Sequence, residues 1–380
     1  MSENLTYAGV GVDYDAMDPF KRMAQLAGRE TAGNIAQRNG GEFKELEASR
    51  GESAYLIEAT KSYFAHVEEG LGTKNLVADA MYGLTGMFGT PKSYYDHIAQ
   101  DTVAMIVNDI ITLGALPLSV AMHLAVGASS WFDDQVRCQD LVNGWKHACN
   151  LARYVWGGGE TPTLKGVVVP EAVVLSGSAM GLVKPKERLI KAENIRHGDA
   201  IIIIESSGIH ANGLTLAREI ASWLPDGYLT KLSDGRAYGE ALLDPTCIYV
   251  PVIDECQKHG INIHYAVNIT GHGWRKLMRA PQSFAYVIES LPRQLPIFDF
   301  IQKHGPVDNR EAYGNLNMGA GFALYVDESD VERIFALLKL GLWPGNFSMV
   351  FAGHVEKSDV KKVLIKPKGL EYLGSTLGVR

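Results

Sequence analysis

A seven-residue stretch near the start of the chain combines groups that could hold a nucleotide phosphate. Residues 68–74 read Glu-Glu-Gly-Leu-Gly-Thr-Lys, between a strand-like run at 63–67 and a helix-like run at 75–82. A Gly-rich turn between a strand and a helix presents backbone N–H groups to phosphate. Lys74 would add positive charge, and an acid such as Glu69 could hold a divalent cation.

The spacing of this stretch excludes two well-known nucleotide motifs. The Walker A pattern G-x-x-x-x-G-K-[ST] is absent, and Asn75 stands where a dinucleotide fingerprint would need a third glycine. Taken alone, a strand-ending turn with solvated charges explains the stretch equally well. The functional interpretation therefore depends on the other motifs of the chain.

A second group of polar residues lies within an apolar run that predicts a helix over 98–115. Asp101 and Asn108 are seven residues apart and share a helix face, whereas Asp109 lies about 12 Å from Asp101 along the axis. One ion cannot easily bridge the two carboxylates, but a row of ions along a triphosphate could. A helix cap at Asp101 followed by a chance polar pair is the structural alternative.

Three further Gly-rich segments could approach a ligand closely. Residues 156–162 contain three successive glycines followed by Glu160, which could hold a metal, although a flexible turn fits as well. Residues 206–213 follow a strand with four isoleucines at 199–205, which we expect to be buried on both faces, and resemble a phosphate cradle. Residues 268–273 form the third Gly-rich segment.

Strand, Gly-rich turn and helix recur in both halves of the chain, which indicates an α/β fold. The length of 380 residues suggests two domains. Apolar periodicity stops at residues 184–186, so we predict domains at 1–184 and 185–380. The other predicted elements are a helix from about Pro19 with Asp18 as N-cap, strands at 122–128, 173–183 and 322–326, and helices at 133–154, from 242–246 and at 329–340.

Composition narrows the class of protein. Hydrophobic residues make up 46% and charged residues 21% of the chain, as in ordinary soluble enzymes. A net charge of −7 argues against a nucleic-acid partner. The four cysteines form no C-x-x-C pair, so we expect neither a disulfide framework nor a zinc site. With no visible signal peptide or long apolar run, we expect a cytoplasmic protein without a membrane segment.

The order of these motifs resembles that of the aminoimidazole ribonucleotide (AIR) synthetase family, the phosphoribosylformylglycinamidine cyclo-ligases. The resemblance extends from about Gly9 to about Gly353. It implies two α/β domains of the AIR synthase type, with the N-terminal domain pairing across a homodimer and the ATP site near that interface. The matching segments are 69–74, 101–109, 158–161, 206–213, 243–250, 270–273 and 317–321.

The resemblance also implies a reaction, the ring closure of formylglycinamidine ribonucleotide in purine synthesis. ATP phosphorylates the formyl amide oxygen, the amidine nitrogen attacks, and phosphate leaves. Such chemistry needs Mg²⁺ along the triphosphate, positive charge at the γ-phosphate and a clamp on the ribose phosphate.

Matched motif by motif, the resemblance implies four sets of site residues. The metal ligands would be Glu69, Asp101, Asp109 and Glu160. The catalytic residues would be Lys74, Asp109 and His210. The nucleotide would contact Gly70, Gly72, Thr73, Lys74, Asn108, Gly158, Gly159 and Thr161. The acceptor substrate would contact Ser207, Gly208, His210, Asn212, Gly213, Thr270 and Gly271.

The chain departs from the family pattern at three places. Glu69 stands where the family usually has Asp, and residues 162–165 replace its usual Ala-Glu-Met-Pro. In 268–273 the usual His-x-Thr-Gly-Gly-Gly is changed by Asn268 and by His272, which adds bulk where a backbone could approach a ligand. These changes leave open a related enzyme with another substrate, or a nucleotide-binding regulator without activity.

Other related families fit less well. Selenophosphate synthetases use an early Cys or selenocysteine, but the first cysteine here is Cys138; hydrogenase-maturation relatives end in Cys, but this chain ends in Arg380. Thiamine-phosphate kinases lack the loop at 207–213, and formylglycinamidine synthases are usually much longer. A nicotinamide oxidoreductase is disfavoured because its glycine fingerprint is absent.

Overall fold

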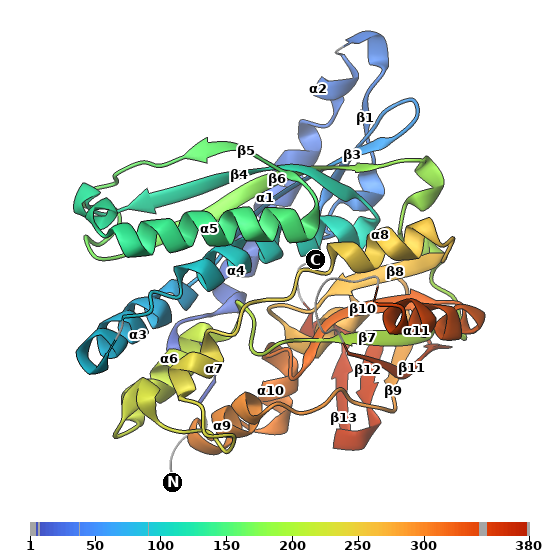
Figure 1. The fold of residues 1–380 in the computed structure, drawn as a ribbon. Helices are drawn as coiled ribbons and strands as arrows, with labels where there is room; N and C mark the ends of the chain where they lie inside the picture. The colour runs from blue at the N-terminus through green and yellow to red at the C-terminus, as the bar shows by residue number, and fades with distance from the viewer. Residues whose placement is uncertain (1–4, 7, 38, 90, 342–347, 378–380) are drawn as a thin grey trace.

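Two mixed β-sheets, each covered by helices, organise the chain (Figure 1). The structure is a computed structural model that describes residues 5–377 with the exception of residues 7, 38, 90 and 342–347. The first sheet lies in the N-terminal half, and its last strand ends at Val183. The second sheet begins at Ala200. The two-domain α/β architecture predicted from the sequence is therefore confirmed, while a boundary between residues 184 and 185 stays a prediction.

The N-terminal sheet has the strand order β1-β2-β3-β6-β4-β5. All its neighbours are antiparallel except β4 and β5, which run parallel. Two long helices, α4 and α5, cover one face (Figure 1). The elements are β1 Lys44–Glu45, β2 Tyr55–Glu58, β3 Tyr63–Gly70, α3 Lys74–Phe88, α4 Tyr95–Ile110, β4 Leu116–Val126, α5 Gln135–Ala152, β5 Val155–Glu160 and β6 Val173–Val183.

Close packing of α4 on β6 depends on two glycines. A Cβ at Gly177 would lie 3.0 Å from Ile106 Cδ1, and one at Gly181 would lie 2.8 Å from Ile110 Cδ1. Such distances leave no room for a side chain between helix and sheet. The helix is consequently central to the domain, and every residue from Asp101 to Ile110 is buried. Its polar residues must therefore find partners inside the protein.

The C-terminal sheet has the order β13-β12-β9-β11-β7-β10-β8. The isoleucine strand β7 pairs antiparallel with both β10 and β11, and its four isoleucines are fully buried. The prediction that this strand is buried on both faces of the sheet is confirmed. The elements are β7 Ala200–Glu205, α6 Leu214–Trp223, α7 Tyr238–Leu242, α8 Val250–Lys258, β8 Ile263–Asn268, β9 Phe284–Ile288, α9 Pro296–His304, α10 Asn309–Asn315, β10 Ala320–Val326, α11 Val331–Lys339, β11 Met349–Lys357, β12 Lys362–Ile365 and β13 Leu370–Leu373.

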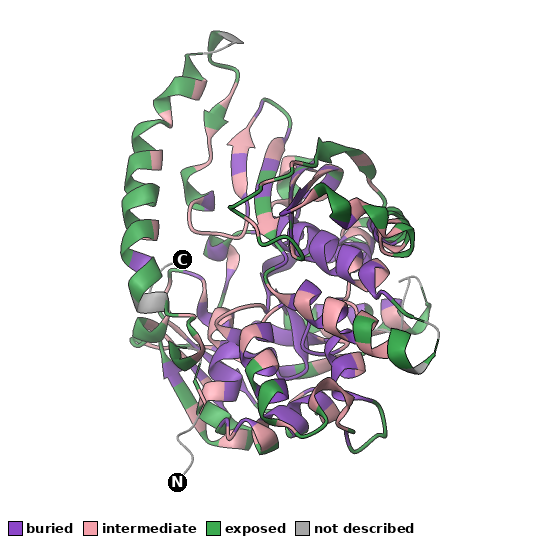
Figure 2. Cartoon of the chain, turned by 90° about the vertical axis from the view of Figure 1, so that its left-hand side faces the viewer, coloured by how far each residue is buried: buried purple, intermediate pink, exposed green. Residues whose placement is uncertain are grey.

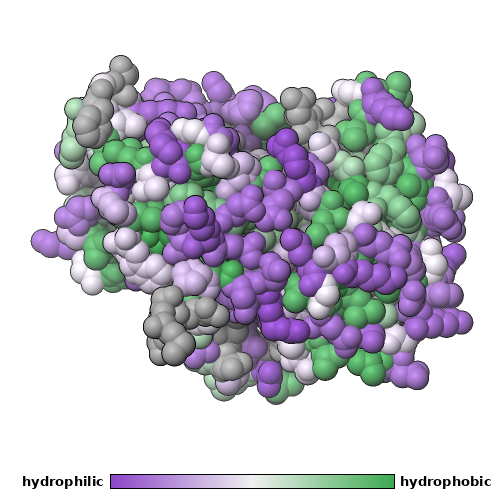
Figure 3. All heavy atoms as spheres, turned by 90° about the horizontal axis from the view of Figure 1, so that it is seen from below, coloured by the Kyte–Doolittle hydropathy of each residue, from purple (hydrophilic) through white to green (hydrophobic). Residues whose placement is uncertain are grey.

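The N-terminal segment, residues 5–36 without residue 7, lies against both domains. Its long helix α1 (Tyr14–Glu30) runs along one side of the molecule with most residues exposed, and the short helix α2 (Gly33–Ala36) follows (Figure 2). The underside of the molecule, which includes α9 and α10, is hydrophilic in its centre and more hydrophobic towards its two sides (Figure 3).

Three sequence-based predictions of secondary structure are wrong. The first helix starts at Tyr14, so Pro19 lies inside it rather than at its first position. Residues 155–160 form the edge strand β5 instead of a turn, because the parallel edge of β4 supplies partners for their backbone. Residues 243–249 connect α7 to α8 without being helical, because their backbone groups bond to side chains of α4.

Two expectations, one about the cysteines and one about membrane segments, can be compared with the structure. All four cysteines are free, as expected, with Cys149 and Cys256 buried. In the described part of the chain, no helix is both long and apolar enough to cross a membrane.

Candidate active site

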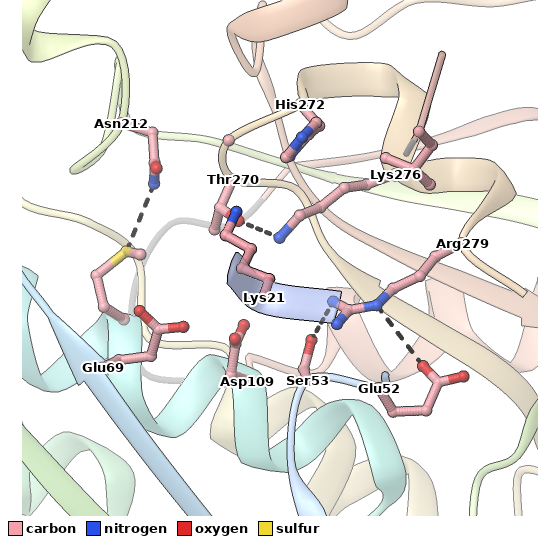
Figure 4. Close-up of a pocket in the computed structure, with 13 residues that line it drawn as sticks. Lys21, Glu52, Ser53, Glu69, Asp109, Asn212, Thr270, His272, Lys276 and Arg279 are labelled. Carbon is pink, nitrogen blue, oxygen red and sulfur yellow. Dashed lines mark hydrogen bonds and ion pairs between the residues drawn. The ribbon is translucent and has the colours of Figure 1, made fainter. Parts of the chain in front are cut away.

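A cavity of about 410 Å³ lies where the two domains and helix α1 meet (Figure 4). Its acids come from the N-terminal domain and most of its basic residues from the C-terminal domain. Five residues predicted from the sequence contribute to it: Glu69, Asp109, Asn212, Thr270 and Gly271. The remaining lining residues are Lys21, Glu52, Ser53, Met105, His272, Lys276, Arg279 and Leu377.

Two carboxylates form the acidic side of the cavity. Glu69 is at the end of β3 and Asp109 in the last turn of α4, so a strand and a helix bring them together. Burial and the nearby Asp109 carboxylate raise the pKa of Glu69. Asp109 is almost fully buried, and its Oδ1 accepts a hydrogen bond of 2.7 Å from Asn268 Nδ2. Two carboxylates confined in this way favour a cation between them.

Lys276 and Arg279 form the basic side, in and just after a short 3₁₀ helix, Gly273–Met278. Lys276 Nζ donates to Thr270 Oγ1. Burial lowers the pKa of Lys276, whereas the Asp109 and Glu69 carboxylates act in the opposite direction. Arg279 donates to Ser53 Oγ at 2.7 Å and to the Gly51 carbonyl at 2.9 Å. Sequence reasoning missed both residues, although basic residues shortly after a Gly-rich turn were a usable signal.

Lys74 and Asp101 are not among the residues that line the cavity. Their side chains are fully buried, and Lys74 Nζ lies 2.9 Å from both oxygens of the Asp101 carboxylate. Lys74 also donates to the Asp244 carbonyl at 2.8 Å. Asp101 Oδ1 accepts from the backbone N–H of Thr246 at 2.8 Å and from its hydroxyl at 2.5 Å. This ion pair therefore joins the two domains.

Asn108 has the same kind of role two turns further along the same face of α4. Its Nδ2 donates to the Cys247 carbonyl at 2.8 Å, and its Oδ1 accepts from the Tyr249 N–H at 2.9 Å. The helix face that Asp101 and Asn108 were predicted to share is therefore turned towards the connection at 243–249. In this structure both side chains bind protein backbone.

The two predicted phosphate cradles lie against each other. A Cβ on Gly72 would lie 4.0 Å from the Ala211 carbonyl, so the turn after β3 touches the loop at 206–213. Gly72 has a φ of 77°, in the left-handed region that favours glycine. The turn residues Gly70, Gly72 and Thr73 adjoin the cavity through Glu69, but do not line it.

Most of the loop at 206–213 faces the protein interior. Ser207 Oγ donates to the Pro245 carbonyl at 2.6 Å, and the Ser207 N–H donates to His210 Nε2 at 3.3 Å. Burial and the Lys74 charge lower the pKa of His210 to about 3, so this imidazole is neutral. Gly208 and Gly213, where α6 begins, are outside the cavity lining as well. Only Asn212 lines the cavity, with its Nδ2 3.7 Å from Met105 Sδ.

The predicted glycine–acid segment 158–161 does not line the cavity. Gly158, Gly159, Glu160 and Thr161 are exposed, and Glu160 pairs with His123 across the β4–β5 register. Within the described residues, no three His, Cys, Asp or Glu side chains are arranged to hold a metal ion. The four acids predicted as ligands therefore do not form one cluster: Glu69 and Asp109 come together, while Asp101 and Glu160 lie elsewhere.

The sequence comparisons agree with the two-domain structure. The family "AIR synthase related protein, N-terminal domain" matches residues 59–183, and the corresponding "C-terminal domain" matches residues 196–363. A phosphoribosylformylglycinamidine cyclo-ligase of Carboxydothermus hydrogenoformans is 34% identical, covering 89% of this chain and 93% of that protein. A Methanocaldococcus jannaschii protein of the same name is 33% identical over 75% of this chain and 77% of its own length.

Solved structures show the same fold at lower identity. The chain superimposes on ThiL in complex with AMPPCP and TMP with a TM-score of 0.54 at 14% identity, covering 85% of this chain and 91% of ThiL. It superimposes on Thermotoga maritima PurL in complex with ATP with a TM-score of 0.54 at 14% identity, covering 85% of this chain and 46% of PurL.

Fold and domain order together define an AIR synthase-like protein with two α/β domains. With about one third of its residues identical to the cyclo-ligases over most of the chain, the protein belongs to the phosphoribosylformylglycinamidine cyclo-ligase family.

Proposed function

We propose that the chain catalyses the ATP-dependent closure of formylglycinamidine ribonucleotide to aminoimidazole ribonucleotide. The observation that carries this proposal is the cavity between the domains, in which two carboxylates face Lys276 and Arg279. Membership of the cyclo-ligase family supplies the substrate and the reaction. A related enzyme with another substrate is the second candidate, raised by the departure at His272 in the cavity wall, but the relatives do not favour it.

The reaction transfers one phosphoryl group and breaks one C–O bond. The formyl amide oxygen attacks the γ-phosphorus of ATP, which forms an O–P bond and releases ADP. The amidine nitrogen then attacks the activated carbon and forms the ring C–N bond. Phosphate leaves with the former amide oxygen, and the attacking nitrogen and the amide nitrogen each lose a proton. One methylene proton moves to the second amidine nitrogen, which becomes the amino group of the aromatic ring.

The acidic side fits a magnesium ion. Mg²⁺ in proteins is commonly bound by one or two carboxylates together with substrate phosphates, so a cluster of three acids is not required. Glu69 and Asp109 provide two carboxylates, and a cation would relieve the repulsion that contributes to the raised pKa of Glu69. When bound, Mg²⁺ would supply positive charge to the triphosphate. We therefore propose Glu69 and Asp109 as its protein ligands.

The other side chains hold and orient the reacting groups. Lys276 is buried beside Thr270 and carries positive charge towards the cavity, where negative charge develops during phosphoryl transfer. Lys74 and Asp101 are positioning residues and do not bind the ligands. They fix the connection at 243–249 against α4, the helix that carries Asp109. The proposed assignment of Lys74 therefore changes from a phosphate contact to a positioning residue.

A homodimer through the N-terminal sheet is part of the proposal. The face of β4, β5 and β6 opposite α4 and α5 points away from the rest of the described chain (Figure 1). It exposes large apolar side chains on adjacent strands, namely Leu118, Val155, Val174 and Met180. An apolar sheet face of this kind favours pairing with a second copy. We also propose a cytoplasmic location, where ATP and Mg²⁺ are supplied.

The test is product formation by the purified protein. With ATP, Mg²⁺ and formylglycinamidine ribonucleotide, we expect aminoimidazole ribonucleotide and ADP in equal amounts. ATP binding without either product would contradict the proposal and favour a regulator. ADP release that depends on a different amide substrate would instead favour the second candidate.

A further inference from the structure

His272 has a backbone conformation that side chains rarely adopt. Its φ is 69°, in the left-handed region, which costs a non-glycine residue roughly 1–2 kcal/mol. The surrounding turn holds it there: the Gly273 N–H donates to the Thr270 carbonyl at 3.0 Å, and the Arg275 N–H donates to the His272 carbonyl at 3.1 Å. An unfavourable conformation that is kept at a cavity wall points to a function for the side chain.

The imidazole lies between two cavities. His272 lines the candidate active site of about 410 Å³ and also a neighbouring cavity of about 570 Å³ under the N-terminal segment. The second cavity is bounded by residues of α1, such as Arg22, and by Arg275 and Asn315 of the C-terminal domain. The His272 side chain is therefore part of the wall that separates the two spaces.

Three cations lie near this side chain. Burial, followed by the charges of Arg275, Lys276 and Lys21, lowers the pKa of His272 to about 3. The neutral ring offers one N–H donor and one acceptor without adding a further charge. The neighbouring cavity also carries the acids Asp13, Asp18 and Glu311, and Asp18 lies 3.5 Å from Lys21. On the side of the candidate active site, His272 instead lies with Lys21 and Lys276, and a hydrogen-bond donor beside these cations suits a phosphate monoester.

The position of His272 indicates which ligand it meets. In Figure 4, His272 and Thr270 lie across the cavity from Glu69 and Asp109, and the Lys276 ammonium proposed to meet the transferred phosphoryl group lies between them. The carboxylates are the proposed metal side, where the triphosphate of ATP is held. The ligand group at the opposite wall then belongs to the acceptor substrate, whose phosphate is a monoester.

We propose that His272 is a specificity-determining residue, which seats the phosphate monoester end of the acceptor substrate and closes the cavity behind it. This inference rests on the proposed function for the identity of the acceptor. It assigns His272 to acceptor recognition and excludes it from ATP binding.

The test compares His272→Gly and His272→Ala with the wild type. Loss of one hydrogen bond to a charged group should raise the KM for the ribonucleotide about 10-fold, while the KM for ATP stays within about twofold. Preference for the ribonucleotide over its dephosphorylated riboside, measured as kcat/KM, should fall by the same factor. Glycine relieves the backbone strain, so His272→Gly should melt no earlier than the wild type, and His272→Ala should melt below His272→Gly.

Arg153→Gly is the matched control. Arg153 also has a left-handed backbone, with a φ of 57°, but caps the exposed end of α5 outside both cavities. Its replacement should leave both KM values unchanged. A His272→Gly enzyme with wild-type KM for the ribonucleotide, or with a raised KM for ATP instead, overturns the inference.

Direct binding separates this inference from the proposed function. If the wild type forms no product, the proposed function fails, and calorimetry with the ribonucleotide and with Mg²⁺–AMPPCP replaces the kinetics. Weaker binding of the ribonucleotide alone by His272→Gly supports the assignment. Unchanged or undetectable binding of the ribonucleotide by both proteins contradicts it.

Discussion

The ammonium group of Lys74 lies 2.9 Å from the carboxylate of Asp101, and both side chains are fully buried at the junction of the two domains. Lys74 opens α3 directly after the Gly-rich turn, and Asp101 lies in α4. Because the pair also binds the backbone of Asp244 and Thr246, it controls how the C-terminal domain meets α4. A residue that the motif placed at the phosphate is thus part of the domain junction.

Removing one member of this pair should destabilise the protein strongly. Lys74→Met leaves the Asp101 carboxylate buried without its cation, which typically costs about 3–5 kcal/mol. The free energy of unfolding from denaturant titration measures the effect. Lys362→Ala is the control, because the Lys362–Glu371 pair is 3.7 Å apart and partly exposed, and such pairs contribute about 0–1 kcal/mol. An equal, small loss in both variants would contradict the structural role of Lys74.

Asp109→Asn should lower activity while the fold is kept. Asparagine preserves the shape and the acceptor for Asn268 but removes the charge proposed to hold Mg²⁺. We expect weaker Mg²⁺–ATP binding and a fall in kcat/KM of about 100-fold, the top of the range for mutation of residues that support metal ligands. The control is Asp133→Asn, an exposed residue outside the cavity. Near-wild-type turnover at saturating ATP and Mg²⁺ would remove Asp109 from the ligand set.

Lys276→Met should reduce the rate of the chemical step. Methionine has a similar length but no charge to offer the transferred phosphoryl group, and loss of one such interaction costs about 10²–10³ in kcat. Lys276→Arg should recover part of the loss because the charge is restored. The readout is single-turnover ADP formation, with Lys303→Met on the exposed side of α9 as the control. Equal rates for Lys276→Met and the wild type would exclude this role.

Stability should fall in acid because of His210. Its pKa is lowered from 6.5 to about 3 in the folded protein, so below pH 6.5 the unfolded chain binds a proton that the folded chain does not. The free energy of unfolding should therefore decrease as the pH falls from 6.5 towards 3, by about 2 kcal/mol at pH 5 from this group. His210→Gln should flatten the dependence, whereas the exposed His147→Gln should not. A His210→Gln protein with an unchanged pH slope would refute the assignment.

The sequence predicts the secondary structure of some elements of this protein better than that of others. Strand 173–183 and the isoleucine strand were predictable because local patterning and burial agree. Residues 155–160 were not, because a run of glycines has no side-chain pattern and becomes a strand only through the edge of β4. Residues 243–249 were not, because the side chains that fix their path lie more than 100 residues earlier in the sequence.

The candidate site shows the same division. Glu69 and Asp109 were identified by their place beside a Gly-rich turn and inside an apolar helix, and the fold brings them together. Lys74 and Asp101 belong to the same two motifs, yet their side chains bind each other inside the protein. Motifs report which chemistry is available, whereas the partner that each side chain finds is decided by packing between the domains.

The connection at 243–249 is recognised by side chains of α4 almost entirely through its main chain. Gln100 binds the Thr246 carbonyl at 2.9 Å, Asp101 the Thr246 N–H, and Asn108 the Cys247 carbonyl and the Tyr249 N–H. Recognition of this kind depends little on which residues the segment contains, but strictly on how many there are. Proline is excluded at the two donating positions, and the buried side chains of Leu243, Thr246 and Tyr249 are constrained by packing as well. A one-residue insertion or deletion would shift the whole register against α4, so the fold fixes the length of this connection.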